Sequence, residues 1–417
     1  MAIINRQSSI GNTYPALALF LAASLLVPLS ACSRRPAPPQ PYLAFVASYQ
    51  TGSVAVVHLS TFRVVASVAV MPNPDTIAIR PRTQDVWVFS RMHGRVSVLS
   101  FPGLAVKGSL QIGMMARSLT FSPDGKQAYA LNVATSEIVY VDCDSLREKA
   151  RLAITPRAKI EPLPALPAKD PQRPSAPETQ AAKGPPPSDW ALTLTPDGKT
   201  LIASDSSRGV LHFVDVGSKK LLGFVEVGKQ PGPLAVLPDS SKVFVGNTGE
   251  EKLSAVDITS RRLLSHIELG MKPGALLLKP DGGELFVMCP QAATICIVDA
   301  FHDNVSQNIS TGRGPAAAVS RRDSSMLYVA NAGDGSVTSL DVQNRVVVAS
   351  TQVGKEPRAL ALTPDERFLV AADAATSSLA VMFAEPERLA KMRSALVTTI
   401  PVGAGPVDVV VPDWLRE

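Results

Sequence analysis

The sequence predicts an all-β protein, an eight-bladed β-propeller with four strands in each blade. One observation behind this prediction is a unit of 42 residues, seen most plainly from Ser325 to Glu366, in which turn residues separate four short apolar runs. The other is that the unit recurs eight times at a constant step of 42, broken by a single insertion of 31 residues. Four strands cannot bury two faces alone, so each unit needs neighbours.

The strands of the unit are predicted from its apolar runs, which are mostly β-branched or aliphatic and alternate with small or polar residues. These runs are Leu327–Ala330, Val337–Leu340, Val346–Val353 and Ala359–Leu362. The eight units begin at Tyr42, Gln84, Lys126, Lys199, Ser241, Gly283, Ser325 and Arg367. A ring of blades explains better than an open solenoid why neither end of the repeat carries a polar cap.

Four columns of residues recur at this step, and each marks a turn. Small polar residues dominate the end of the first strand, at Ser48, Ser90, Asn132, Asp205, Asn247, Cys289, Asn331 and Asp373. The second strand ends at an aspartate in five units, at Asp142, Asp215, Asp257, Asp299 and Asp341. We expect these carboxylates to accept hydrogen bonds from backbone N–H groups two residues further on. A Pro-Asp turn and a Gly-x-x-Pro loop form the other two columns.

Two motifs carry a resemblance to a known family. Tyr328-Val-Ala-Asn331 followed by Gly335-Ser-Val, and Ser122-Pro-Asp-Gly125, resemble the YVTN repeat of YncE-like and surface-layer β-propellers. The resemblance covers nearly all of residues 42–413 and implies that the strand before each Pro-Asp turn lies innermost. The first blade would then combine Val407–Val411 as inner strand with the strands of Tyr42–Val70, which closes the ring. Many such propellers have seven blades, whereas this sequence contains eight units.

The first 31 residues are predicted to be a signal peptide, because a single charge, Arg6, precedes an apolar run that is too short for a confident membrane span. Leu29-Ser-Ala-Cys32 resembles a bacterial lipobox, which implies cleavage before Cys32 and acylation of that residue. Several acyl chains give firm membrane anchoring. The alternative is an ordinary cleavage near Ala31 that leaves a free cysteine.

The remaining segments complete the domain organisation. Residues 32–41 are predicted to be a proline-rich tether, and residues 42–417 the propeller domain. Ser33 after the cysteine implies, by analogy with lipoprotein sorting, an outer-membrane protein that faces the periplasm or the cell surface. Residues 156–187 contain ten prolines and are predicted to form a disordered insertion. One or two helical turns are expected between Glu385 and Arg393.

The histidines and cysteines suggest no cofactor site. The repeat scatters the five histidines over different units, and no metal or haem motif is present, so we expect neither metal nor cofactor. Cys289 and Cys296 lie on partner strands, and matched turns would place them directly opposite each other. The oxidising compartment favours a disulfide, and two buried thiols are the alternative. Cys143 has no evident partner.

The Gly-x-x-Pro loops are the best candidate for ligand binding. Each of four loops contains a cation, and two further arginines occupy equivalent positions just beyond a loop. These residues are Lys229, Lys272, Arg313 and Lys355, with Arg117 and Arg358. A ring of cations on one face would attract a carboxylate, a phosphate or a glycan. The alternative is that they are solvated loop charges.

These observations favour a non-enzymatic, lipid-anchored binding or scaffold protein of the cell envelope, which we expect to be a monomer. Its partners would be the membrane, through Cys32, and an envelope protein, a glycan or a small anion. An enzyme or cofactor-associated subunit, of lactonase or of quinone- or haem-dehydrogenase type, is an alternative based on fold alone. A third reading is single-stranded DNA binding. The net charge of +5, or +4 without Arg6, provides little attraction for phosphates, and the 5% aromatic content provides few rings for base stacking.

Overall fold

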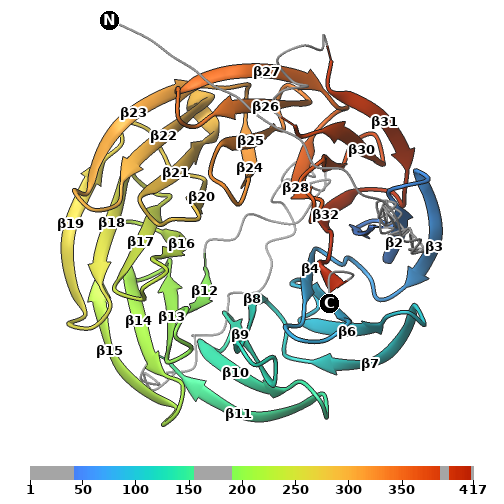
Figure 1. Cartoon of the computed structure of the whole chain (residues 1–417). Coiled ribbons are helices and arrows are strands. Elements are labelled where there is room, and N and C mark those ends of the chain that lie inside the picture. The colour runs from blue at the N-terminus through green and yellow to red at the C-terminus, as the bar shows by residue number, and fades with distance from the viewer. Residues whose placement is uncertain (1–41, 155–189, 386–393, 415–417) are drawn as a thin grey trace, which may run out of the picture. The chain divides into compact units, whose positions relative to one another are not determined.

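A computed structural model describes residues 42–154, 190–385 and 394–414, which form a ring of eight four-stranded antiparallel sheets (Figure 1). The predicted eight-bladed propeller is therefore confirmed. The signal peptide, Cys32, the tether, the insertion at 156–187 and nearly all of the expected helical turns lie outside the described residues. Within the described residues, no helix is long and apolar enough to span a membrane.

The strands are short and nearly uniform. Blade 1 consists of β32 (Pro406–Val410), β1 (Leu43–Ser48), β2 (Ser53–His58) and β3 (Arg63–Ala69), from the centre outwards. Blade 2 contains β4 (Thr76–Ile79), β5 (Asp85–Ser90), β6 (Arg95–Ser100) and β7 (Ala105–Gln111). Blade 3 contains β8 (Ala116–Phe121), β9 (Gln127–Asn132), β10 (Glu137–Asp142) and β11 (Arg147–Ala153). Blade 4 contains β12 (Leu192–Leu194), β13 (Thr200–Asp205), β14 (Val210–Asp215) and β15 (Lys220–Glu226).

The second half of the ring repeats this pattern. Blade 5 contains β16 (Pro231–Val236), β17 (Lys242–Asn247), β18 (Lys252–Asp257) and β19 (Arg262–Glu268). Blade 6 contains β20 (Ala275–Leu278), β21 (Glu284–Cys289), the short 3-10 helix η1 (Pro290–Ala292), β22 (Thr294–Asp299) and β23 (Asn304–Ser310). Blade 7 contains β24 (Pro315–Ser320), β25 (Met326–Asn331), β26 (Ser336–Asp341) and β27 (Val346–Gln352). Blade 8 contains β28 (Pro357–Leu362), β29 (Phe368–Asp373), β30 (Ser378–Phe383) and β31 (Leu396–Pro401).

The ring closes through the last strand of the chain. β32 pairs antiparallel with β1, with Val409 opposite Val46, so residues from the two ends of the chain share blade 1. This is the predicted closure, and it removes the free inner edge that β1 would otherwise present. Trp414, just beyond β32, packs its ring against Phe45 and Phe101 at centroid distances of 5.7 and 5.2 Å, which ties the same end to blades 1 and 2.

The core lies between blades rather than within one. The two middle strands of each blade are almost wholly buried, because apolar side chains on both faces of the sheet pack against the neighbouring blades. Phe45 of blade 1, for example, belongs to the same buried cluster as Val88 of blade 2. The outer strands alternate between exposed and partly buried side chains instead. This explains why only the outermost strands show the two-residue period of a half-exposed strand.

The Gly-x-x-Pro loops contain glycine for a steric reason. The column that runs from Ser48 to Asp373 ends the first strand of each sequence unit, which is the second strand of each blade counted from the centre. Its residue is at most 3% exposed in all eight blades. It packs against the loop that enters the same blade: a Cβ on Gly312 would lie 2.7 Å from Asn331, and one on Gly354 would lie 1.7 Å from Asp373. Any larger residue would overlap the buried side chain. Gly270 has open space but a φ of +71°, which also favours glycine.

The aspartate columns form the predicted turns, with one correction. The Oδ1 atoms of Asp142, Asp215, Asp257 and Asp341 accept a backbone N–H from three residues further on instead of two. Asp299 accepts both, the predicted N–H of Phe301 at 2.8 Å and that of His302 at 3.0 Å. The Pro-Asp turns do use the residue two positions on, as Asp124 does when it accepts the N–H of Lys126 at 3.0 Å. Both columns are thus structural, because these carboxylates satisfy backbone donors at the ends of strands.

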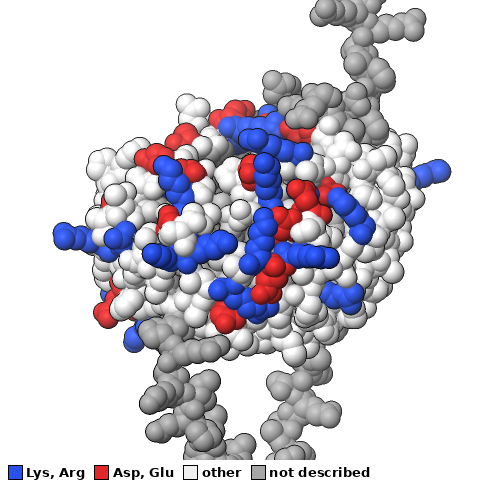
Figure 2. All heavy atoms as spheres, turned by 90° about the horizontal axis from the view of Figure 1, so that it is seen from below, with Lys and Arg blue, Asp and Glu red and all other residues white. Residues whose placement is uncertain are grey.

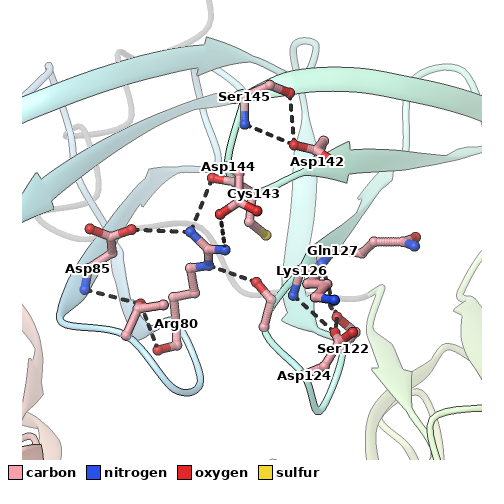
Figure 3. Close-up of polar contacts among 12 residues, drawn as sticks. Arg80, Asp85, Ser122, Asp124, Lys126, Gln127, Asp142, Cys143, Asp144 and Ser145 are labelled. Atoms are coloured by element: carbon pink, nitrogen blue, oxygen red, sulfur yellow. Dashed lines mark hydrogen bonds and ion pairs between the residues drawn. The ribbon is translucent and has the colours of Figure 1, made fainter.

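Two arginines connect blades on the face that carries the Pro-Asp turns. Arg80 of blade 2 is buried, with 5% of the residue exposed. Its side chain donates to the backbone oxygens of Gly125 and Cys143 in blade 3, at 2.7 and 3.4 Å (Figure 3). It also forms ion pairs with Asp85 and Asp144. Arg321 of blade 7 donates to Glu366 and Ala384 of blade 8 at the same sequence offsets, 45 and 63 residues. The repeat therefore places the same inter-blade contact twice.

Candidate ligand-binding face

The loops that connect one blade to the next form, together with the turns between β13 and β14 and their equivalents, one face of the ring, which we call the loop face. Hydrogen bonds join the loops that contain Lys229, Arg313 and Lys355 to a turn of the blade that each loop enters. The carbonyl oxygens of Lys229, Arg313 and Lys355 accept the N–H groups of Gly249, Gly333 and Ala375 at 2.9–3.1 Å. The cations predicted from the sequence therefore sit on loops that are held in place.

A hollow of about 830 Å³ opens on this face between blades 4 and 5. Its lining includes three cationic side chains, two carboxylates and a histidine: Arg208, Lys229, Lys252, Glu226, Glu250 and His266. Ser206, Ser207 and Gln230 add neutral donors and acceptors. The hollow is thus polar, carries both charge signs and has a cationic excess.

The lining cations differ in how far they are neutralised. Lys252 forms an ion pair with Glu268 at 2.9 Å, and Arg208 lies 3.7 Å from the buried Asp205. Lys229 is exposed, and its ammonium has no ion pair among the described residues; only its backbone N–H is bound, by Glu250 at 3.1 Å. Lys229 is therefore the cation most available to a ligand.

Hydrogen bonds orient His266 from behind. Asn247 and Ser254 are fully buried, and the Asn247 amide donates to the Ser254 hydroxyl oxygen at 3.0 Å. That hydroxyl lies 3.1 Å from His266 Nδ1. Because the Ser254 oxygen already accepts one hydrogen, its own proton is available to Nδ1. This favours the tautomer that carries its hydrogen on Nε2, which gives the hollow a further donor.

The other predicted cations do not join this hollow. Lys272 and Lys355 are exposed on the loops that enter blades 6 and 8, and Arg313, on the loop that enters blade 7, is ion-paired with Asp334. The four loop cations thus share a face without forming a single site. Sequence reasoning missed Arg208, Lys252 and His266, since only the approach of two neighbouring blades reveals them.

Arg117 and Arg358 occupy the second position of the inner strands β8 and β28. Both are partly buried. Arg358 has one ion pair, to Glu356 at 3.5 Å, and its Nε is buried without a partner among the described residues. For Arg117, the described residues provide neither a hydrogen bond nor an ion pair. Unlike the exposed loop lysines, these two guanidinium groups are partly shielded from solvent.

The cysteine register is not the predicted one. Cys296 lies opposite Val287, and Cys289 opposite Thr294, so the two cysteines are diagonal neighbours. Their Sγ atoms are 3.5 Å apart, and the structure holds both as free, fully buried thiols. The pair occupies the positions that hold hydrogen-bonded Asn331 and Thr338 in blade 7. The structure therefore has no disulfide here, although the thiols lie close together.

The histidines are separated, as the repeat predicts. His58 ends β2, His212 lies on β14 and His266 on β19, while His93 and His302 lie in turns. Across residues 42–154, 190–385 and 394–414, no three His, Cys, Asp or Glu side chains are grouped as a metal site requires. His212 is buried and lies 3.6 Å from the Asp205 carboxylate.

The outer wall offers no uniform charge. Figure 2 views the wall around β7, β11 and β15, where Lys and Arg alternate with Asp and Glu. Many of these charges are paired, such as Lys107 with Asp85 and Arg151 with Glu148. Paired charges of mixed sign attract a polyanion weakly. The loop face is therefore the better candidate for recognition.

Comparisons with known proteins agree with the fold. A family model described as "Lactonase, 7-bladed beta-propeller" matches residues 290–405, about a quarter of the chain. The chain is thus similar to that family over blades 6 to 8, and it has eight blades where the description gives seven. No curated protein matches the chain.

Solved structures are similar over most of the chain. Dihydro-heme d1 dehydrogenase NirN, in complex with DHE, superposes with a TM-score of 0.68 at 16% identity, covering 88% of this chain and 74% of that one. Apo AztD from Citrobacter koseri superposes with a TM-score of 0.64 at 12% identity, covering 89% and 98%. A functionally unknown protein from Desulfotomaculum acetoxidans DSM 771 gives 0.54 at 14% identity, covering 79% and 99%. At these identities the likeness concerns the fold alone.

Proposed function

We propose that this protein is a non-enzymatic propeller that binds a small anionic ligand in the hollow between blades 4 and 5. The observation that carries the proposal is the exposed Lys229 ammonium, which has no ion pair among the described residues and stands on a hydrogen-bonded loop beside Arg208 and His266. The carboxylates Glu226 and Glu250 suit a ligand that also donates, through hydroxyl or ammonium groups. In such folds a rigid scaffold of strands commonly holds the loops that bind ligands.

The test is a binding screen of small carboxylates, phosphates and acidic sugars by calorimetry. Lys229→Gln should weaken the best ligand about tenfold or more, since a charge-assisted contact contributes about 1.5–3 kcal/mol. The matched control is Lys220→Gln on β15, an exposed lysine outside the hollow. Unchanged affinity in Lys229→Gln, and in a variant with Lys229, Lys272, Arg313 and Lys355 all replaced by Gln, would rule the proposal out.

The proposal includes the location of the protein. A lipid on Cys32 would hold the propeller in the cell envelope, at the outer membrane facing the periplasm or at the cell surface. Labelled fatty acid should be incorporated into the wild-type protein, and Cys32→Ser should abolish incorporation and move the protein to the soluble fraction. Incorporation that persists in Cys32→Ser would contradict the anchor.

A second candidate function is catalysis. The match of residues 290–405 to the lactonase family favours lactone hydrolysis, and the NirN likeness extends the candidate to a cofactor-associated role. Turnover of simple δ-lactones, or a visible absorption band in the purified domain, would support this candidate over the binding protein.

A further inference from the structure

The inner strands form a repeating set of hydrogen-bond donors at the centre of the ring. Two side chains from one blade accept a backbone N–H of the next: Asp408 Oδ2 accepts the N–H of Ile77 at 2.8 Å, and Ser118 Oγ accepts that of Leu192 at 3.1 Å. Positions are counted along the repeat from the residue equivalent to Pro406 and Ala116, the first residues of β32 and β8; this is Pro74 in blade 2 and residue 189 in blade 4. In this count the acceptors are at the third position and the donors at the fourth position of the next blade. These N–H groups therefore point out of their own sheet.

The same register recurs in blades 5 to 8. Ile77 pairs with Val88 and Leu192 with Ala203, each eleven residues on. The fourth-position residues of blades 5 to 8 pair with the residue at the same offset. They are Leu234, Leu276, Ala318 and Leu360. An identical register gives an identical N–H direction, so these four amides also point to the inner edge.

The preceding blades supply these four amides with no side-chain acceptor. The third-position residues in front of them are Ala191, Pro233, Ala275 and Ala317, none of which has a polar side chain. All four donor residues are partly exposed, although they lie on the inner strands. These partly exposed residues of the inner strands border the centre of the ring, which we call the channel.

A guanidinium lies on the same inner strand as the last of these donors. Arg358 stands two residues before Leu360 on β28, and its Nε is buried without a partner among the described residues. The carboxylates Asp408 and Asp75 belong to blades 1 and 2, and Glu356 is the acid that contacts Arg358. Blades 5 to 8 therefore combine four amides without a side-chain acceptor with the Arg358 guanidinium.

We propose that the channel edge of blades 5 to 8 is a second anion site, in which backbone amides and the Arg358 guanidinium bind a carboxylate or phosphate group. Backbone N–H groups that have no protein acceptor can donate to an anion, as they do in other anion-binding sites. The site is separate from the hollow that contains Lys229, so it adds to the proposed function.

The structure itself suggests the decisive variants. Ala317→Asp places in front of Leu360 the carboxylate that Asp408 places in front of Ile77, and Ala317→Ser copies Ser118. We expect titration of wild-type protein with inorganic phosphate at low ionic strength to show millimolar binding. Ala317→Asp should weaken it at least tenfold, Arg358→Gln about tenfold, and Ala317→Ser two- to fivefold, because it occupies one amide without adding charge.

The controls separate the two sites. Lys229→Gln and Lys220→Gln should leave phosphate binding at the channel unchanged. Phosphate binding that is lost in Lys229→Gln but kept in Ala317→Asp and Arg358→Gln would overturn this inference and leave the proposed function standing. Wild-type protein that binds no phosphate would also overturn it. If Ala317→Asp fails to fold, Arg358→Gln and Ala317→Ser still decide the outcome.

Discussion

Asp408 shows how one residue can make ring closure depend on pH. Burial raises its pKa to about 6, against the lowering effect of the hydrogen bonds from the N–H groups of Ile77 and Val409. The folded protein thus binds this proton more tightly than the unfolded chain does. At acidic pH, where Asp408 is protonated in both states, it does not lower the free energy of unfolding. The loss grows from about pH 4 to above pH 6, where it reaches roughly 3 kcal/mol.

We therefore predict that Asp408→Asn matches wild type in stability near pH 4 and exceeds it by roughly 2–3 kcal/mol at pH 7, because the amide oxygen can still accept the Ile77 N–H. Urea unfolding at the two pH values measures this difference. Asp215→Asn is a control in which the effect should have the opposite sign. Because the hydrogen bonds from Ser218 lower the pKa of Asp215, this variant should be less stable than wild type at pH 7 and equally stable in strong acid. A loss of stability in Asp408→Asn at pH 7 would contradict the argument.

At the scale of elements, each blade depends on how its entering loop meets the buried polar residue. Gly354→Ala should lower the free energy of unfolding by about 1–3 kcal/mol, because the new methyl group would overlap the Asp373 carboxylate. Gly103→Ala is a matched control, since its Cβ would make only an ordinary contact at 3.7 Å. Adding Asp373→Ala to Gly354→Ala should recover part of the loss. Strict additivity of the two losses would show that the overlap is not the cause.

The contact between blades 2 and 3 provides a second test at this scale. Arg80→Ala should destabilise the protein by about 3–5 kcal/mol, because it leaves the buried Asp85 with a single partner, Lys107, and removes two donors to backbone oxygens. Arg80→Lys should recover little, since an ammonium cannot reproduce contacts spread over the guanidinium fork. Thermal unfolding compares these variants. Arg82→Ala, in the adjacent turn, is the neutral control.

For the whole molecule, stability depends on closing the ring. Truncation before Pro406 removes β32 and exposes the inner edge of β1, so we expect aggregation and a broadened thermal transition. Truncation after Trp414 keeps β32 and the aromatic contacts, and it should behave like wild type. Size-exclusion chromatography and calorimetry distinguish the two. A monomeric, sharply unfolding protein without β32 would show that closure is dispensable.

The sequence by itself determined the architecture of this protein. A constant step of 42 residues specifies identical strands and turns. The resemblance to YVTN-type propellers implies which strand lies innermost, and this assigned Val407–Val411 to the first blade. The turn roles of Asp341 and its equivalents also followed from local spacing, since an aspartate and the backbone that it binds are near neighbours in the chain.

Only the tertiary structure decided which distant residues meet. The diagonal placement of Cys289 and Cys296 follows from a hairpin register that other blades share, since Cys289 lies opposite Thr294 just as Asn331 lies opposite Ser336 in blade 7. The hollow beside Lys229 depends on the spacing between blades 4 and 5, and the inter-blade contacts of Arg80 join residues 45 and 63 positions apart. The periodicity of the sequence determines the strands and turns of each blade, whereas long-range packing determines which side chains of neighbouring blades come together. The candidate sites lie between blades or at the centre of the ring, so the sequence could indicate Lys229 and Arg358 but not the neighbours Arg208, Lys252 and His266.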